Sequence, residues 1–297
     1  MKKKSKMGTF DTFNSKRVSY ILVTKNRAKL LNNALKMAQK LKKGNDEIIV
    51  VDGLSSDTTL EIIKNNKKTI DKYISEPDIS PSHAANKGIL LASGKYIKTI
   101  ADDEIYYGNA MEKAIEVMEN NNDIDILECG GKIYDLSTKS SRTLYKKPGI
   151  NFGKSIDDIF FYGSNGAGYI IRRSSLAKIG TFPMDIVSDL TFMVNSIKNG
   201  ANVKFCRVKL YKQLVHKNNI SITNPQVSAT LYRLVKHNAP KKYYFPYAFN
   251  YYIRNNPILK TLFFPVILLH NKYVMNLFIP DKKNLKNKQY IWDGGLS

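Results

Sequence analysis

Short apolar runs rich in β-branched residues alternate with amphipathic, helix-like segments along the first hundred residues of the chain. The expected strands span residues 18–23, 47–51, 72–75 and 96–100, and the expected helices span 28–42, 57–66 and 82–91. Strands that alternate with helices of this length are typical of βαβ units. The pattern therefore predicts an α/β fold with a mostly parallel central sheet flanked by helices.

Polar side chains follow three of these strands directly. Residues 24–27 follow the first strand, Asp52 follows the second, and the carboxylates of Asp102, Asp103 and Glu104 follow the fourth. In a doubly wound sheet such strand ends lie along one edge, where ligands bind, so we expect these groups to share a pocket. Carboxylates suit Mg²⁺ or Mn²⁺, and Mg²⁺ is usually held by one or two of them together with substrate phosphates. The pattern thus indicates a metal and diphosphate site.

Each polar cluster also has a plain structural interpretation. The acidic triplet could be a solvated turn at the start of the helix expected at 108–121, because acids stabilise a helix N-terminus. Asp52 could accept the imide N–H of a uracil ring and Arg27 could face phosphate, whereas Asp52 and Gly53 by themselves favour a simple turn. Nucleotide fingerprints are missing, since no GxGxxG follows the first strand and GILLASGK (88–95) is one residue too long for a P-loop.

The charge indicates the kind of partner. A formal net charge of +22 over 297 residues favours an anionic partner, and a membrane surface fits as well as nucleic acid.

Cys129 and Cys206 lie in strand-like segments without metal-binding spacing, so we expect core thiols in a reducing compartment. Residues 1–16 are basic, but no apolar stretch long enough for a signal peptide follows them. We therefore expect a flexible basic arm and a cytoplasmic protein.

The composition changes from residue 224 onward. No Glu occurs there, Asp281 and Asp293 are the only acidic residues, and Lys or Arg recurs among many aromatic residues. The apolar run at 258–269 contains Lys260 and Pro265 and falls short of the roughly 20 residues that a membrane span needs. Three interpretations remain open: a helical element in the membrane interface, helices packed on the rest of the protein, or tyrosines that stack on nucleic acid bases.

The order of the motifs resembles that of the family 2 glycosyltransferases with the type A fold. The matching segments are YILVTKNR (20–27), IIVVDGLSSDTT (48–59), SEPDISPSHAANKGILLASGKYI (75–97) and ADDE (101–104). With the later segments 179–183 and 188–192, the resemblance covers about the first 220 residues. It implies a Rossmann-like sheet and an inverting transfer from a nucleotide sugar, with a UDP sugar as the expected donor and Mn²⁺ or Mg²⁺ as cofactor.

The resemblance also implies roles for individual residues. It places Asp52 at the nucleobase of the donor, Asp102 near the ribose and Asp103 on the metal. His216 is a second candidate for contact with the metal or the diphosphate. Asp189 opens a helix expected at 189–198; the pattern alone favours a helix-start residue, but the family carries its catalytic base there. The full set of expected donor contacts is Thr24, Asn26, Arg27, Asp52, Asn86 and Asp102.

Two departures from the family pattern concern the donor contacts. Ala85 stands where the family often has Arg, and the metal motif is Ala-Asp-Asp in place of Asp-x-Asp. The chemistry nevertheless requires a group such as Asp189, because an acceptor hydroxyl must lose its proton as it attacks the anomeric carbon.

The expected organisation has four parts. Residues 1–16 form the arm, 17–107 the nucleotide-sugar half and 108–222 the acceptor half of a catalytic domain, and 223–297 the C-terminal extension. Within the acceptor half we expect loops and short strands at 138–161 and a strand at 203–208. Within the nucleotide-sugar half we expect Ser56 to cap the second helix.

The acceptor would be a glycan or a lipid-linked or surface-polysaccharide molecule at the cytosolic face of the inner membrane. An anionic membrane surface is the expected partner, and no nucleic acid is expected. The competing functions are a sugar nucleotidyltransferase and a basic protein that binds nucleic acid or another anionic polymer.

Overall fold

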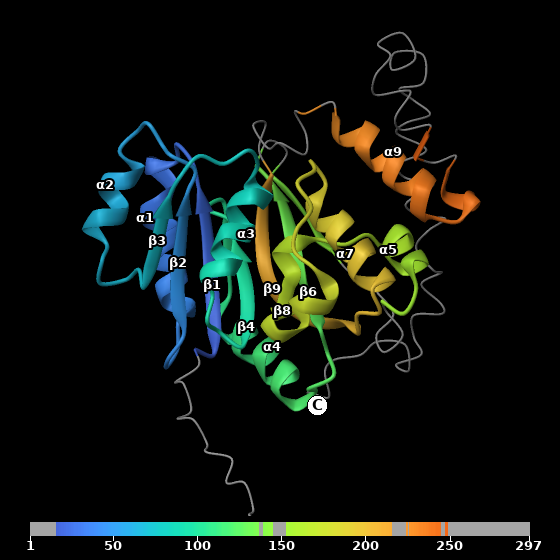
Figure 1. Cartoon of the computed structure of the whole chain (residues 1–297), viewed down its shortest axis with the longest axis horizontal. Coiled ribbons are helices and arrows are strands. Elements are labelled where there is room, and N and C mark those ends of the chain that lie inside the picture. The colour runs from blue at the N-terminus through green and yellow to red at the C-terminus, as the bar shows by residue number, and fades with distance from the viewer. Residues whose placement is uncertain are drawn as a thin grey trace, which may run out of the picture.

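Four parallel strands form the N-terminal half of a single sheet, in the order β3–β2–β1–β4 (Figure 1). The computed structural model describes residues 16–136, 139–144, 153–215, 224, 226–244 and 247–248. The four strands are β1 Val18–Thr24, β2 Glu47–Asp52, β3 Lys72–Ser75 and β4 Tyr96–Ile100. Buried residues face both sides of β1 and β2, as expected for parallel strands covered by helices on both faces.

Helices cover the two faces of this half with separate apolar clusters. They are α1 Ala28–Leu41, α2 Thr59–Asn65, α3 Pro81–Leu91 and α4 Gly108–Asn120. Helices α1, α2 and α4 pack with Tyr20 and Leu22 of β1 on one face. Helix α3 packs with Ile21 and Val51 on the other face. Because side chains alternate along a strand, successive residues of β1 enter different layers.

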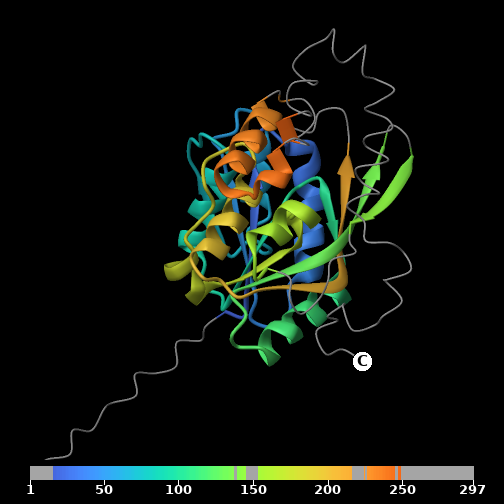
Figure 2. The ribbon, with the colours of Figure 1, turned by 90° about the vertical axis from the view of Figure 1, so that its right-hand side faces the viewer.

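The C-terminal half turns the sheet into a mixed one. Its strands are β5 Glu104–Tyr106, β6 Ile126–Asp135, β7 Ser140–Leu144, β8 Tyr169–Arg172 and β9 Val203–Val215. Strand β8 is antiparallel to β4 and β6, β6 runs parallel to β9, and β5 and β7 pair antiparallel with β9 and β6. Figure 2 shows β6 and β9 side by side. The short loop after β4 therefore leads from the middle of the sheet to β5 at its far edge, beside α1.

A second group of helices covers the C-terminal half. They are α5 Ile156–Tyr162, α6 Leu176–Ile179, α7 Ser188–Lys198 and α9 Gln226–Asn238, with single 3₁₀ turns η1 Gly166–Gly168, η2 Arg173–Ser175 and η3 Lys241–Tyr243. Residues of α5, α7 and α9 share the apolar cluster of α3. Figure 1 shows α5, α7 and α9 together on the side of the C-terminal half of the sheet. No helix in the described ranges is both long and apolar enough to cross a membrane.

The structure confirms the expected α/β fold and corrects three local expectations. Ser56 does not cap α2, which begins at Thr59; the backbone N–H of Ser56 instead donates to the side chain of Asn26. The segment 138–161 contains β7 and most of α5, and the strand expected at 203–208 continues to Val215 because it pairs along β6 and β5. The apolar run at 258–269 and residues 1–15 lie outside the described residues.

The contact between α3 and β1 depends on Gly88. A Cβ atom at this position would lie 2.3 Å from Cγ2 of the buried Ile21, so we expect Gly88→Ala to lower the free energy of unfolding by about 1–3 kcal/mol through overpacking. The matched control is Gly108→Ala at the start of α4, where the added Cβ meets nothing closer than 3.7 Å. Urea denaturation measures both variants, and equal stabilities for the two would contradict this account of the packing.

Candidate functional site

Two loops at the carboxyl ends of β1 and β2 are tied together by hydrogen bonds. The backbone N–H of Gly53 donates to the carbonyl of Thr24 at 2.9 Å. The backbone N–H of Asn26 donates to Oγ of Ser55 at 2.7 Å, and that of Ser56 donates to Oδ1 of Asn26 at 2.8 Å. Asn26 has φ of 53°, in the left-handed region that Asn tolerates better than most residues. The loops therefore form one rigid rim.

The second loop also caps helix α1 from outside. Arg27 stands at the N-cap of α1 and supplies no side-chain cap of its own. The N–H of Ala28 donates to Oδ2 of Asp57 at 3.2 Å, and the N–H of Arg27 donates to Oγ1 of Thr59 at 3.2 Å. These bonds satisfy donors that a helix start leaves free. The sequence analysis missed this role of Asp57, although the Ser-Ser-Asp-Thr-Thr run is rich in capping residues.

Asp52 is fully buried and holds its own loop. Its carboxylate accepts from the hydroxyl and the N–H of Ser55, the latter at 3.2 Å, and from Oγ of Ser75 at 2.6 Å. These three donors leave room for one more, because a carboxylate offers about four lone-pair sites. Asp52 thus joins the loops after β2 and β3.

A third loop closes the rim beside Gly53. A Cβ at Gly53 would lie 2.0 Å from Oδ2 of Asp78, so glycine is required here by the close approach of the Asp78 side chain. Asp78 also pairs with Nζ of Lys25 at 3.5 Å. The Asp-Gly dipeptide is therefore more than a local turn, since distant residues meet at it.

The acidic residues after β4 lie against the same rim. Nη1 of Arg27 is 3.3 Å from Oδ1 of Asp102 and 3.9 Å from Oδ2 of Asp103, and Oγ1 of Thr24 donates to Oδ2 of Asp102 at 3.5 Å. The Asp102 side chain is 7% exposed and that of Asp103 is 22% exposed. Burial raises the pKa of Asp102, while the charge of Arg27 lowers it. The structure thus brings Thr24, Arg27, Asp52 and Asp102 to one edge of the sheet, as the sequence predicts.

A buried lysine supports the third acidic residue. Nζ of Lys98, in β4, donates to the carbonyl of Thr99 at 2.7 Å and lies 4.7 Å from the ring centroid of Tyr106. The hydroxyl of Tyr106 donates to Oε2 of Glu104. Burial lowers the pKa of Lys98 to about 8, against the opposing effect of Glu104, and burial raises the pKa of Glu104. Glu104 therefore faces inward as a partner of Lys98 and Tyr106.

The donor set of this turn fits a divalent cation that is completed by a ligand. Within the described ranges no group of three or more His, Cys, Asp or Glu side chains is arranged to hold a metal ion. Asp102 and Asp103 offer hard oxygen atoms, and Mg²⁺ is usually bound by one or two carboxylates together with substrate phosphates. His216, the other sequence candidate, lies outside the described residues.

Asp189 lies in the first turn of α7, one of the helices that cover the C-terminal half of the sheet. Its Oδ2 accepts from the N–H of Gly166 at 3.1 Å, and its Oδ1 accepts from the N–H of Leu190 at 3.0 Å. Burial raises the pKa of Asp189, and these two N–H groups lower it. Turn η1, which contains Gly166, lies against β4, β6 and β9. Turn η1 therefore contacts both Asp189 and β4, the strand that precedes the acidic turn.

The geometry concerns one further predicted residue, Asn86, and one residue that was not predicted, Glu128. Asn86 uses both ends of its amide on Phe182, donating to the carbonyl at 2.8 Å and accepting from the N–H at 3.0 Å. It braces α3 against the segment before α7, and a donor contact by Asn86 stays a prediction. The sequence analysis missed Glu128 in β6, which is fully buried and accepts from Ser164 and Asn165. A lone acid in an apolar run was the signal for it.

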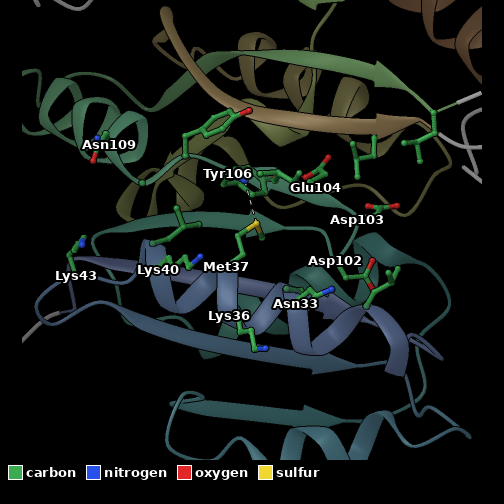
Figure 3. Close-up of a pocket in the computed structure, with 18 residues that line it drawn as sticks. Asn33, Lys36, Met37, Lys40, Lys43, Asp102, Asp103, Glu104, Tyr106 and Asn109 are labelled. Atoms are coloured by element: carbon green, nitrogen blue, oxygen red, sulfur yellow. Dashed lines mark hydrogen bonds between the residues drawn. The ribbon is translucent and has the colours of Figure 1, made fainter. Parts of the chain in front are cut away.

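A cavity of about 910 Å³ lies between α1 and β5 (Figure 3). Asp102 and Asp103 lie at one end of it, and Lys43 and Asn109 lie at the other. Between them Met37 of α1 faces Tyr106, whose N–H donates to the sulfur atom at 3.3 Å. Asp52 and Asp189 do not line this cavity. The cavity thus meets the rim only at its acidic end.

Comparison with known proteins identifies sequence relatives. Residues 19–180 match the family model described as glycosyl transferase family 2. An uncharacterized glycosyltransferase of Rickettsia prowazekii is 31% identical over 173 residues, which cover 56% of this chain and 53% of the relative. The poly-beta-1,6-N-acetyl-D-glucosamine synthase of Staphylococcus epidermidis is 25% identical over 182 residues, which cover 58% and 43%. The chain spans about half the length of the curated relatives it matches.

Solved structures with the same fold include two with nucleotide sugars. TarS of S. aureus, in complex with UDP-GlcNAc, has a TM-score of 0.62 at 16% identity, covering 80% of this chain and 74% of TarS. The mannosyltransferase PcManGT of Pyrobaculum calidifontis, in complex with GDP-Man and Mn²⁺, has a TM-score of 0.58 at 15% identity, covering 92% and 84%. At these identities the likeness establishes the fold.

The position of Arg27 between two carboxylates leads to a test of the metal site. We expect Arg27→Met to tighten Mn²⁺ binding in the absence of nucleotide about fivefold, or about 1 kcal/mol, because the partly exposed guanidinium competes with the cation. The same change should weaken binding of UDP, which loses a positive partner. Lys25→Met is the matched control, because Lys25 pairs with Asp78 outside the acidic turn. Calorimetric titration measures both ligands, and an unchanged or weaker Mn²⁺ affinity in Arg27→Met would contradict this account.

Proposed function

The chain belongs to glycosyl transferase family 2, and from that premise we propose that it transfers a sugar from a nucleotide sugar to an acceptor hydroxyl with inversion. The observation that carries the proposal is the gathering of Thr24, Arg27, Asp52 and Asp102 at one edge of the sheet. In open α/β sheets ligands bind at the carboxyl ends of the strands. The rim combines positive charge for phosphates with carboxylates that suit a cation.

We assign the nucleotide to the loops after β1 and β2. Asp52 lies at the base end, where its remaining lone pair suits the imide N–H of uracil. Thr24 and Asn26 frame the loop, Arg27 faces the diphosphate, and Asp102 lies near the ribose. TarS, in complex with UDP-GlcNAc, supports a UDP sugar, whereas PcManGT, in complex with GDP-Man, makes a guanosine donor the competing choice.

We assign the proton transfer to Asp189. As the acceptor oxygen bonds to the anomeric carbon, its proton passes to the Asp189 carboxylate, and the bond from that carbon to the diphosphate oxygen breaks. A carboxylate whose pKa is raised by burial is a stronger base than an exposed one. The N–H groups of Gly166 and Leu190 keep the carboxylate oriented. A divalent ion bound at Asp103 would stabilise negative charge on the departing diphosphate.

We propose a glycan acceptor that is lipid-linked or part of a surface polysaccharide. The synthase of S. epidermidis, whose name gives a poly-N-acetylglucosamine product, supports a polysaccharide acceptor. The net charge of +22 supports attachment to an anionic membrane surface, which we place at the cytosolic face of the inner membrane. Residues 17–107 would bind the donor and residues 108–222 the acceptor.

Two substitutions test the assignment of the reaction. Asp189→Asn keeps the shape but removes the base, so we expect turnover of UDP-GlcNAc with Mn²⁺ to fall by roughly 10²–10⁴-fold, with UDP binding unchanged. Asp103→Ala should abolish the dependence of UDP binding on Mn²⁺. Asp185→Asn, in the same segment, is the control that should retain turnover. Release of UDP and GDP from their sugar donors is the measurement, and full activity of Asp103→Ala and Asp189→Asn would refute the proposal.

The raised pKa of Asp189 predicts a pH dependence. Only the ionised carboxylate can accept the proton, so kcat/KM should fall as the pH drops through a pKa that lies above the ordinary value of 3.8. The charge of Asp185 contributes to the raised pKa, so Asp185→Asn should move the acid limb to lower pH. A pH–rate profile of the two proteins checks the sign, and a shift to higher pH would contradict it.

A further inference from the structure

Glu128 is a buried carboxylate that the proposed reaction does not use. It lies in β6 with no solvent exposure. Its Oε2 accepts from Oγ of Ser164 at 2.8 Å, and its Oε1 accepts from the N–H of Asn165 at 3.1 Å. Burying a charged group is costly unless it is well bonded, so its presence in an apolar strand calls for a specific role. Both of its donors belong to the segment just before η1.

The segment that Glu128 holds is the one that contacts Asp189. The next residue, Gly166, donates its N–H to Oδ2 of Asp189 at 3.1 Å. Oγ of Ser164 also lies 2.5 Å from the hydroxyl of Tyr169, whose single hydrogen is shared between that oxygen and the carbonyl of Asp189 at 3.3 Å. Two separate paths therefore run from Glu128 to the side chain and the backbone of Asp189.

Close packing leaves this segment little freedom to adjust. A Cβ at Gly166 would lie 3.0 Å from Cβ of Asp189, and a Cβ at Gly168 would lie 2.5 Å from the carbonyl oxygen of Cys129. The segment is thus wedged between β6 on one side and α7 on the other. Because packed interiors transmit small displacements, a shift at Asn165 reaches Asp189.

We propose that Glu128 is a positioning residue for Asp189, which it orients through the segment Ser164–Gly166. The inference rests on the proposed role of Asp189 as the base, but the link between the two carboxylates can be measured without any substrate. Glu128 touches no reacting atom in this scheme. It fixes where the N–H of Gly166 points.

The link has a measurable electrostatic consequence. The N–H of Gly166 lowers the pKa of Asp189, so displacement of that N–H should raise the pKa. Among the described residues, Asp185 acts on Asp189 through its charge and Tyr169 lies beside its carbonyl, and neither is altered in the variants below. A role of Glu128 in stability alone would leave the titration of Asp189 unchanged.

Three variants of the full chain separate positioning from stability. Glu128→Met has similar length but no acceptor, so the donors of Ser164 and Asn165 lose their partner. Glu128→Gln keeps one oxygen for the N–H of Asn165 and serves as the conservative replacement. Asp125→Asn is the matched control, because Asp125 is also a buried acid at the start of the same region and accepts from Ser175, Lys178 and Asn202. These three donors lie in η2, in α6 and just before β9, outside the segment Ser164–Gly166.

The first measurement is the carboxyl titration of Asp189 by ¹³C NMR, with the signal assigned from its absence in Asp189→Asn. We expect an upward shift in Glu128→Met, a value near that of the parent protein in Glu128→Gln, and no shift in Asp125→Asn. An unchanged titration in a folded Glu128→Met protein would overturn the proposal. So would an equal shift in Asp125→Asn, since it would show a general effect of destabilisation.

The second measurement is UDP release from UDP-GlcNAc with Mn²⁺. For Glu128→Met we expect kcat to fall about tenfold or more with the KM for the donor unchanged, because the donor rim is built from other loops. The acid limb of the pH–rate profile should move to higher pH, and Glu128→Gln should restore most of the rate. If the parent protein has no transferase activity, the proposed function fails while the titration still decides the link. If activity is present and Glu128→Met keeps the parent kcat and pH profile, the positioning role is refuted.

Discussion

The structure depends on how buried and half-buried carboxylates are satisfied at one edge of the sheet. A carboxylate taken out of water must be matched by donors or by a cation. Asp52 is matched by Ser55 and Ser75, Glu128 by Ser164 and Asn165, and Asp102 by Thr24 and Arg27. In each case at least one donor, namely Ser55, Asn165 or Arg27, lies in a loop between two successive elements of secondary structure. The hydrogen bonds that satisfy these acids therefore also fix the loops.

The two halves of the sheet contribute different parts of the site. The parallel strands β3–β2–β1–β4 end on the same edge, so their loops meet without any long connection. In the mixed half β6 leads the chain back to that edge, and η1, at the start of the antiparallel β8, lies against β4. Gly166 of η1 donates its N–H to Asp189. The acids after β4 thus stand at the junction of the two halves.

Local patterns predicted much of this arrangement. The period of the apolar residues located β1, α1, β2, β3, α3 and β4 to within a residue or two, because their buried faces are regular. Residues 24–27, Asp52 and Asp102 were expected at one edge on topology alone, and the structure places them there. The loops and short strands expected at 138–161 include β7, but the helix α5 was missed because it spans only seven residues and has no clear period. Ser56 was misassigned because its partner, Asn26, belongs to another loop.

The sequence by itself determined the α/β class, the strand-end clusters and the family to which the chain belongs, because these follow from local periodicity and from the order of short motifs. Only the tertiary structure decided which donor each acid receives. It showed that Gly53 is needed for the approach of Asp78, that Asn86 braces Phe182, and that Glu128 is linked to Asp189. These contacts join residues that are distant in the chain, and no local pattern records them. They arise from the register of the strands and from the need to bond every buried charge.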